Sequence, residues 1–210
     1  MFDANAARTP PRVALLLSGG GRSALNLHRA FVESRPRATT ALILAHNESH
    51  AGVALCRNAG LSVTIIPRAL PNLDDAIDRA LEAAEVELVC LAGYLRKFRV
   101  GNRWHNRVLN MHPALLPDFG GAGMFGLHVH AKVLESGRTE SGCTVHLVDD
   151  EYDHGNIVLA HRVPVLDGDT QESLAARVFA QECIAYPEAV TQWIEKNLQA
   201  KDPLCPSPSS

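Results

Sequence analysis

The pattern of apolar and polar positions in the first half of the chain alternates between two kinds of segment. Short runs rich in leucine, isoleucine and valine predict strands at residues 13–17, 39–45, 62–66, 86–92 and 107–111. Between the first four strands, apolar residues recur every three or four positions and predict amphipathic helices at residues 23–34, 49–59 and 72–84. This alternation is typical of parallel βαβ units, and strands that are apolar on both faces indicate helices on both sides of a sheet.

The third of these helices has a recognisable beginning. Asn72 is a favourable N-cap residue, and Asp74 and Asp75 place negative charge in the first turn. The helix dipole favours negative charge at that end. We therefore expect the helix to begin at residue 72.

The alternation of predicted strands and helices ends after residue 112. The stretch "PALLPDFGGAGMFG" (113–126) is rich in glycine and proline and predicts a long loop. Loops of that length inside a compact domain usually have a function. A short helix is expected at 127–136, ending before Gly137, a residue suited to a left-handed cap. Two further strands, at 142–148 and 156–166, flank an acidic segment and predict an antiparallel hairpin.

The C-terminal part of the chain predicts one more helix. Asp169 is expected to begin it, with Glu172 three residues later at the capping-box position. Pro187 is expected to break this helix before a final turn that ends near residue 197. Together, the elements predict an α/β fold with a mostly parallel central sheet, flanking helices and a C-terminal antiparallel hairpin.

The length of 210 residues is that of one domain. We expect this domain at 13–197, after a flexible lead at 1–12. A disordered tail is expected at 198–210, where "KDPLCPSPSS" is rich in proline and serine.

Composition and charge narrow the classes of function. The chain is 46% hydrophobic and 20% charged with a formal net charge of -3, which is typical of a soluble globular protein and argues against a general nucleic-acid partner. Its 5 cysteines are an odd number without a C-x-x-C pair, which favours free thiols in a reducing cytoplasm. No apolar run reaches the roughly 20 residues that span a bilayer, and the first residues do not resemble a secretory signal.

A glycine-rich loop follows the first predicted strand and opens the first helix. In "LLLSGGGRSALNL" (15–27), backbone N–H groups and the helix N-terminus can face a bound anion, and Arg22 favours a phosphate. Gly19, Gly21 and Ala24 also fit the dinucleotide pattern G-x-G-x-x-A. That alternative calls for an acid at the end of the second strand, where "AHNES" has Glu48 two residues late. A third interpretation is a tight strand-to-helix turn without a ligand.

The segment "VLNMHPALLP" (108–117) carries the clearest candidate chemistry. Alternation along a strand places Asn110 and His112 on one face at its C-terminal end, where ligands bind in open α/β sheets. An asparagine amide can donate to an oxygen that becomes negative, and a histidine can move protons near neutral pH. The pair suggests acyl transfer to an amine, although both could be ordinary polar residues. If Asp153 reaches His112, we expect it to raise the pKa of the histidine.

Histidine is frequent in the second half of the chain, so a metal site is an alternative. The candidate ligands are His128, His130, His146, His154 and His161. The two histidines of the H-x-H at 128 and 130 lie on different sides of a helix, and no close set of three ligands is apparent. We expect no metal.

Four segments together resemble the folate-dependent formyltransferase family. They occur in the order "LAGYLRKF" (91–98), "LNMHPALLP" (109–117), "GLHVH" (126–130) and "SGCTVHLVDDEYDHGNIV" (141–158), within a resemblance that runs from about residue 13 to 193. The resemblance implies a Rossmann-like formyltransferase fold. It implies transfer of a formyl group from 10-formyltetrahydrofolate, a co-substrate, to the amine of 5-phospho-ribosylglycinamide in purine biosynthesis.

The resemblance also implies roles for particular residues. Asn110, His112 and Asp153 match the catalytic asparagine, histidine and aspartate of the family: Asn110 would hold the formyl oxygen, His112 would carry the proton, and Asp153 would orient the histidine. Glu182 matches a glutamate on the amine side of the substrate. The phosphate of the substrate would lie against Gly19, Gly20, Gly21, Arg22 and Ser23. The folate would contact Leu95, Arg96, Lys97, Phe98, Asn110, Val148 and Asp150.

The chain departs from the family pattern at three places. The usual phosphate loop S-G-x-G-S-N is here S-G-G-G-R-S, the loop at 118–126 is long, and "DHGN" follows the aspartate. An amine on a sugar nucleotide is therefore an alternative acceptor, and a dehydrogenase or nucleotide-binding module is the alternative from another class. The expected partners are small molecules, with no nucleic acid or membrane, in a monomer or homodimer.

Overall fold

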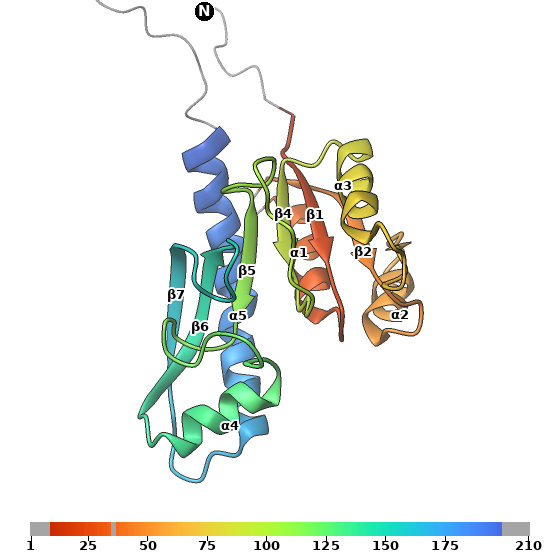
Figure 1. Ribbon diagram of the computed structural model, residues 1–210. Coiled ribbons are helices and arrows are strands. Elements are labelled where there is room, and N and C mark those ends of the chain that lie inside the picture. Colours follow the sequence, from red (N-terminus) through yellow and green to blue (C-terminus); the bar gives the residue numbers. More distant parts are fainter. Residues whose placement is uncertain (1–8, 35–36, 199–210) are drawn as a thin grey trace, which may run out of the picture.

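The computed structural model describes residues 9–34 and 37–198, and its centre is a seven-stranded sheet (Figure 1). In chain order the strands are β1 (Arg12–Leu16), β2 (Thr39–Ala45), β3 (Thr64–Ile65), β4 (Leu88–Leu91), β5 (Val108–His112), β6 (Glu140–Leu147) and β7 (Ile157–Pro164). In space they follow the order β3-β2-β1-β4-β5-β6-β7. Parts of the predicted lead and tail, residues 1–8 and 199–210, lie outside the described residues.

Helices cover both faces of the sheet, as predicted from strands that are apolar on both faces. They are α1 (Arg22–Val32), α2 (Ala51–Asn58), α3 (Leu73–Ala83), α4 (Leu127–Glu135) and α5 (Gln171–Leu198). The first strand shows the division: Val13 and Leu15 pack with α1, α2, α4 and α5, whereas Ala14 and Leu16 pack with α3 and the segment 94–104. Alternate side chains of a strand point to opposite faces, so one apolar run serves two cores.

The predicted strands and helices are confirmed with small differences at their ends. In proportion to its length, β3 differs most, because it contains 2 residues where 5 were predicted. It pairs only with β2, through Leu44 with Thr64 and Ala45 with Ile65, so it is an edge strand with a short ladder. Asn72 precedes α3 as expected, but its side chain makes no capping hydrogen bond.

The prediction that Pro187 breaks the last helix is wrong. Helix α5 is continuous over 28 residues, with Pro187 inside it. A proline cannot donate to the carbonyl four residues earlier, here that of Cys183. That carbonyl instead accepts a hydrogen bond from Nδ2 of Asn26 on α1, at 2.9 Å. A tertiary contact thus replaces the missing helical hydrogen bond.

The predicted start of the same helix also needs correction. The reciprocal cap is made by Thr170 and Ser173: each backbone N–H donates to the hydroxyl of the other, at 3.0 and 3.3 Å. Asp169 instead accepts hydrogen bonds from Arg177, and this guanidinium lowers the pKa of the Asp169 carboxyl. The box therefore lies one residue later than predicted.

Strand direction changes between β5 and β6. Strand β5 pairs in parallel with β4 but antiparallel with β6, which then forms the predicted hairpin with β7. The register places Asn110 opposite His146 and His112 opposite Thr144. These pairings confirm the predicted α/β fold with a C-terminal antiparallel part. Within residues 9–34 and 37–198, no helix is both long and apolar enough to cross a membrane.

Candidate active site

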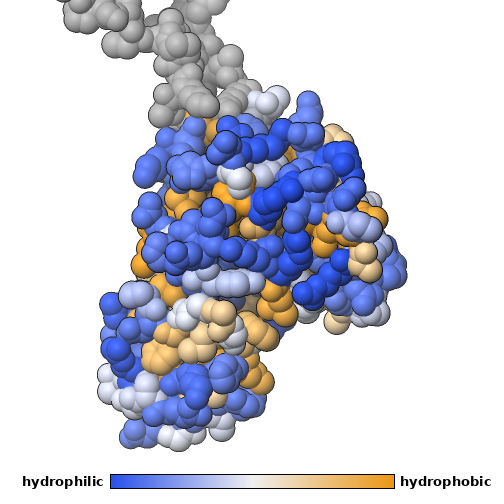
Figure 2. Space-filling model, viewed as in Figure 1, coloured by the Kyte–Doolittle hydropathy of each residue, from blue (hydrophilic) through white to orange (hydrophobic). Residues whose placement is uncertain are grey.

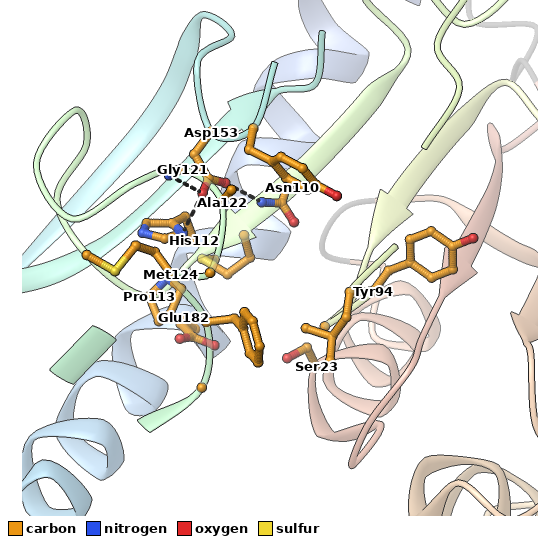
Figure 3. Close-up of a pocket in the computed structure, with 17 residues that line it drawn as sticks. Ser23, Tyr94, Asn110, His112, Pro113, Gly121, Ala122, Met124, Asp153 and Glu182 are labelled. Carbon is orange, nitrogen blue, oxygen red and sulfur yellow. Dashed lines mark hydrogen bonds and ion pairs between the residues drawn. The ribbon is translucent and has the colours of Figure 1, made fainter. Parts of the chain in front are cut away.

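A cavity of about 340 Å³ opens at the C-terminal end of β5. It is the larger of two adjoining cavities, and we call it the larger cavity. Figure 3 shows His112, Pro113, Asp153 and Glu182 on one side of it, with Ser23 and Tyr94 across the opening. Residues expected at the site from five separate segments therefore line one space. They are Ser23, Leu95, Asn110, His112, Asp153 and Glu182.

Asp153 lies at the centre of the polar groups beside this cavity. One of its carboxylate oxygens lies 3.4 Å from Nδ1 of His112 and accepts a hydrogen bond from the backbone N–H of Gly121 at 3.0 Å. The other accepts from Nδ2 of Asn110 at 3.3 Å. The predicted contact between Asp153 and His112 is confirmed.

His112 is buried, and both of its ring nitrogens are engaged. Nε2 donates to the carbonyl oxygen of Phe119 at 2.8 Å, and Nδ1 faces Asp153. Burial lowers the pKa of His112 below its ordinary value, although Asp153 and the Phe119 carbonyl favour the charged form. Asp153 raises the pKa of His112 as predicted, but loss of solvent around the ring lowers it by more, so the net shift is downward.

The amide of Asn110 has a defined orientation. Nδ2 lies 3.1 Å from Nε2 of His146 and 3.3 Å from an oxygen of Asp153, so both amide hydrogens have acceptors. Figure 3 shows the amide oxygen turned toward the cavity instead. To hold a formyl oxygen, Asn110 has to exchange one of these bonds for a bond to the substrate, and the longer bond to Asp153 is the weaker of the two.

His146 is a member of this cluster that sequence reasoning considered only as a metal ligand. It lies opposite Asn110 on β6, and its Nδ1 donates to the Leu147 carbonyl at 2.8 Å, which leaves Nε2 to accept from Asn110. Nε2 also lies 3.4 Å from Asp153. The predicted antiparallel hairpin was a sequence signal for this contact. The register that pairs β6 with β5 cannot be predicted from the sequence of either strand alone.

Thr144 holds the loop that follows His112. Its hydroxyl donates to the Ala114 carbonyl at 2.7 Å and accepts from the backbone N–H of Leu116 at 3.1 Å. The threonine is completely buried, so it supplies hydrogen bonds that water does not. This side chain therefore fixes the direction of the chain just after the catalytic histidine candidate.

The glycine-rich loop is tightly packed. Gly21 has a φ of 72°, and a Cβ atom there would lie 2.6 Å from the Cα of Gly52 at the start of α2. Only glycine fits both conditions. The predicted strand-to-helix turn is thus present, and Ser23 in the first turn of α1 lines the larger cavity. The Arg22 guanidinium lies over the ring of Phe179 on α5, 4.1 Å from its centroid.

The end of β2 bears on the dinucleotide alternative. Glu48, the nearest acid, forms an ion pair with Arg57 on α2. His46 is buried, with Nδ1 donating to the Ile66 carbonyl at 2.7 Å and Nε2 lying 2.6 Å from the Tyr94 hydroxyl. The carboxylate that a dinucleotide ribose would contact is therefore already engaged.

A smaller cavity of about 50 Å³ adjoins the larger one, and both share Tyr94, Asn110, Tyr152 and Asp153. Five of the expected folate contacts line it, namely Arg96, Lys97, Phe98, Asn110 and Val148. Asp150 lines neither cavity, in contrast to the expectation. It is exposed in the acidic loop, whereas its neighbours Asp149 and Glu151 line the smaller cavity.

Glu182 reaches the larger cavity from α5. Within the part of the chain that the structure describes, no hydrogen bond or ion pair engages its carboxylate. Burial raises its pKa to about 7, and Arg22 opposes this rise. The carboxyl is therefore divided between its charged and neutral forms near pH 7.

The histidines considered as metal ligands are spread over the fold. His128 is exposed and His130 is buried on α4, His154 pairs with Asp149, and His161 lies 3.3 Å from Glu188. Over residues 9–34 and 37–198, no group of three or more His, Cys, Asp or Glu side chains is placed to hold a metal ion.

Comparison with known proteins identifies relatives over most of the chain. A family model described as Formyl transferase matches residues 11–190. The chain is 34% identical over 198 residues to the chloroplastic phosphoribosylglycinamide formyltransferase of Arabidopsis thaliana, covering 91% of this chain and 68% of that protein. It is 36% identical to the Vigna unguiculata protein of the same name, covering 89% of this chain and 62% of the relative.

Solved structures agree with these sequences. The glycinamide ribonucleotide transformylase 1 of Symbiobacterium toebii has a TM-score of 0.82 and 36% identity, covering 90% of this chain and 89% of that one. The phosphoribosylglycinamide formyltransferase of Brucella melitensis has a TM-score of 0.79 and 36% identity, covering 88% and 95%. By sequence and by structure, the chain belongs to the formyl transferase family.

Proposed function

We propose that the protein transfers a formyl group from 10-formyltetrahydrofolate to the amine of 5-phospho-ribosylglycinamide, a step of purine biosynthesis. The observation that carries this proposal is the convergence of Asn110, His112 and Asp153 on one cavity. The names of the similar proteins from Arabidopsis thaliana, Symbiobacterium toebii and Brucella melitensis support the same acceptor.

The two cavities suggest where the substrates bind. The pterin of the folate lies at the smaller cavity, beside Arg96 and Val148, and the formyl group extends toward Asn110, which both cavities share. The phosphate of the ribotide binds at the glycine-rich loop, near Ser23. Its amine then lies between that loop and the formyl group, on the side where Glu182 reaches the cavity.

The reaction begins when the neutral amine attacks the formyl carbon. Asn110 exchanges its 3.3 Å hydrogen bond with Asp153 for one to the developing oxyanion, an interaction worth about 3 kcal/mol of barrier. His112 takes a proton from the attacking nitrogen, because its lowered pKa keeps the ring neutral near pH 7. The imidazolium, stabilised by Asp153, then protonates N10 as the C–N10 bond breaks.

The loop at 118–126 participates in this proton transfer. Nε2 of His112 is bonded to the Phe119 carbonyl, and Gly121 binds Asp153, so a ring nitrogen becomes available when the loop moves by a small amount. Hydrophobic and weakly polar side chains gather over this loop and α4 in Figure 2. One of them, Phe125, lines the larger cavity while 53% exposed. A bound substrate would cover it.

We also propose that the reaction takes place in a reducing compartment, the cytoplasm. Four cysteines of the described chain are free thiols, and three of these are buried. Free thiols persist in reducing compartments.

A formyl-transfer assay tests the proposed acceptor. Purified protein is incubated with 10-formyltetrahydrofolate and either 5-phospho-ribosylglycinamide or a panel of amino sugars and sugar nucleotides, and tetrahydrofolate release is followed. We expect turnover with the ribotide and a large preference for it over its dephosphorylated form. Faster transfer to a sugar nucleotide would assign a different acceptor. Binding of NADH but not of a folate analogue would point to another class of protein.

A further inference from the structure

The segment that follows β4 borders both cavities. Tyr94 lines the larger and the smaller cavity, and Arg96, Lys97 and Phe98 line the smaller one. Because we place the pterin at the smaller cavity, the position of this segment decides whether the folate can bind. Contacts with the ends of β1 and β2 and with α3 hold the segment in place.

The contacts with β1 and α3 keep their form near neutral pH. Directly after β1, the Ser18 N–H donates to the Gly93 carbonyl at 3.1 Å, and the Leu95 N–H donates to the Ser18 hydroxyl at 3.2 Å. On α3, Asp74 accepts a hydrogen bond from Arg96 at 2.5 Å. This ion pair lowers the pKa of the Asp74 carboxyl and raises the pKa of Arg96, so both groups stay charged.

The contact with β2 is different, because it contains a buried histidine. His46 directly follows β2 and is 8% exposed, and Tyr94 is 6% exposed. Nδ1 of His46 donates to the Ile66 carbonyl at 2.7 Å, which leaves Nε2 to accept from the Tyr94 hydroxyl at 2.6 Å. Figure 3 shows the Tyr94 ring directed away from Asn110. The phenol therefore ties the segment after β4 to the ends of β2 and β3.

We propose that His46 is a positioning residue for the folate: through Tyr94 it holds residues 93–98 in the place where the pterin binds. This inference rests on the proposed function. The hydrogen bond requires a neutral imidazole, because only an unprotonated Nε2 accepts from the phenol. A protonated ring has donors on both nitrogens, and the Tyr94 hydroxyl then has to turn to another acceptor.

The surroundings of His46 disfavour its charged form. The charged or titratable groups that face it from the neighbouring segments are Arg68, Arg96, His50, Tyr94 and Asp74. Burial is the main cause that lowers the pKa of His46, and the nearby basic groups add to it, whereas the bond to the Ile66 carbonyl opposes it. Burial also raises the pKa of Tyr94, so the phenol keeps its proton. The anchored arrangement therefore pairs a neutral donor with a neutral acceptor.

Acid should weaken this anchor. A histidine whose pKa is lowered in the ordered segment binds a proton more readily when the segment is displaced, so protonation favours the displaced form. Folate binding should be intact above the ordinary histidine pKa of about 6.5 and should weaken as the pH falls below it. The contacts of Ser18 and of the ion pair on α3 do not change in this range, so they do not produce the same effect.

The test is the dissociation constant of a folate analogue that does not itself titrate between about pH 5.5 and 7.5. It is measured by calorimetry for the wild type and for His46→Gln, in which a neutral amide oxygen accepts from Tyr94 at every pH. From pH 7.5 to 5.5 we expect the wild-type constant to rise about threefold more than that of the variant, within the limit of about tenfold per pH unit for one proton. At pH 7.5 the two constants should agree closely. The matched control is His105→Gln, an exposed histidine, which should keep the wild-type pH dependence.

Equal pH dependence in the wild type and His46→Gln would overturn the proposal. Tyr94→Phe keeps the test decisive if His46→Gln does not fold. It removes the hydroxyl, so binding at pH 7.5 should weaken about fivefold, the usual effect of one lost hydrogen bond between neutral groups. An unchanged dissociation constant in Tyr94→Phe would also overturn the proposal. Failure of the proposed function is distinct from these results, because the wild type would then bind no folate analogue at any pH.

Discussion

The parallel part of the sheet and its antiparallel part are built from different side chains. Six polar side chains of the described chain are buried, and none lies within β1, β2, β3 or β4. Four of them, His112, Ser141, Thr144 and His146, lie on β5 and β6, and His130 lies on α4. The sixth, His46, directly follows β2.

This difference shows how the fold separates stability from chemistry. The parallel strands bury apolar side chains on both faces, which requires no particular partner. The pair β5 and β6 buries polar groups, which costs free energy unless each group finds a hydrogen bond. The contacts among Asn110, His146 and Asp153, and those of Thr144 with Ala114 and Leu116, meet that need, whereas the buried Ser141 hydroxyl has no partner among the described residues.

The largest expected effect is on the parallel part. Leu15→Ala removes a completely buried side chain from β1 and should lower the free energy of unfolding by about 3 kcal/mol, from lost burial and the cavity left behind. The variant, where it is folded, should keep a near-normal kcat, because Leu15 does not line either cavity. Chemical denaturation and steady-state kinetics check both points, with Val32→Ala, 70% exposed, as the control.

The next effect is on the antiparallel part. His112→Ala should lower kcat by about 10²-fold or more, equivalent to about 2.7 kcal/mol, with little change in binding of a folate analogue. The matched control is His128→Ala, an exposed histidine of α4. Normal turnover in the His112 variant would remove this residue from the mechanism and weaken the contrast between the two parts.

Threonine and valine have similar shapes, so exchanging one for the other in each part of the sheet tests the difference between the two parts directly. Thr144→Val should cost about 1–3 kcal/mol, because the Ala114 carbonyl and the Leu116 N–H lose their shared partner. Val89→Thr on β4 should cost a similar amount for the opposite reason, since it buries a hydroxyl among apolar side chains. Thermal unfolding measures both. If either substitution leaves the free energy of unfolding unchanged, the two parts of the sheet differ less than their side chains indicate.

The smallest expected effect concerns the charge beside His112. Asp153 favours the charged ring, so Asp153→Asn should lower the pKa of His112 further. NMR titration of the His112 ring measures this directly. The shift is downward because the Asp153 carboxylate stabilises the imidazolium. Without that carboxylate, burial of the ring still favours its neutral form. An unchanged titration midpoint would mean that the 3.4 Å contact has little electrostatic effect.

Local patterns in the sequence predicted the elements and much of their order. Periodicity reports local geometry, so apolar runs and amphipathic stretches located the strands and helices to within a few residues. The same local rule placed Asn110 and His112 on one face at the end of a strand. The four ordered motifs, from 91–98 to 141–158, indicated the family that the comparisons identify.

How distant segments meet depends on tertiary packing. Asn110 and His146 face each other because of a register between β5 and β6, and Asp153 lies 43 residues from Asn110 in the chain. Pro187 stays within α5 because Asn26 satisfies the Cys183 carbonyl. The pKa of His112 falls because the ring is buried. Register, hydrogen-bond replacement and loss of solvent all depend on packing between segments, which local spacing does not encode.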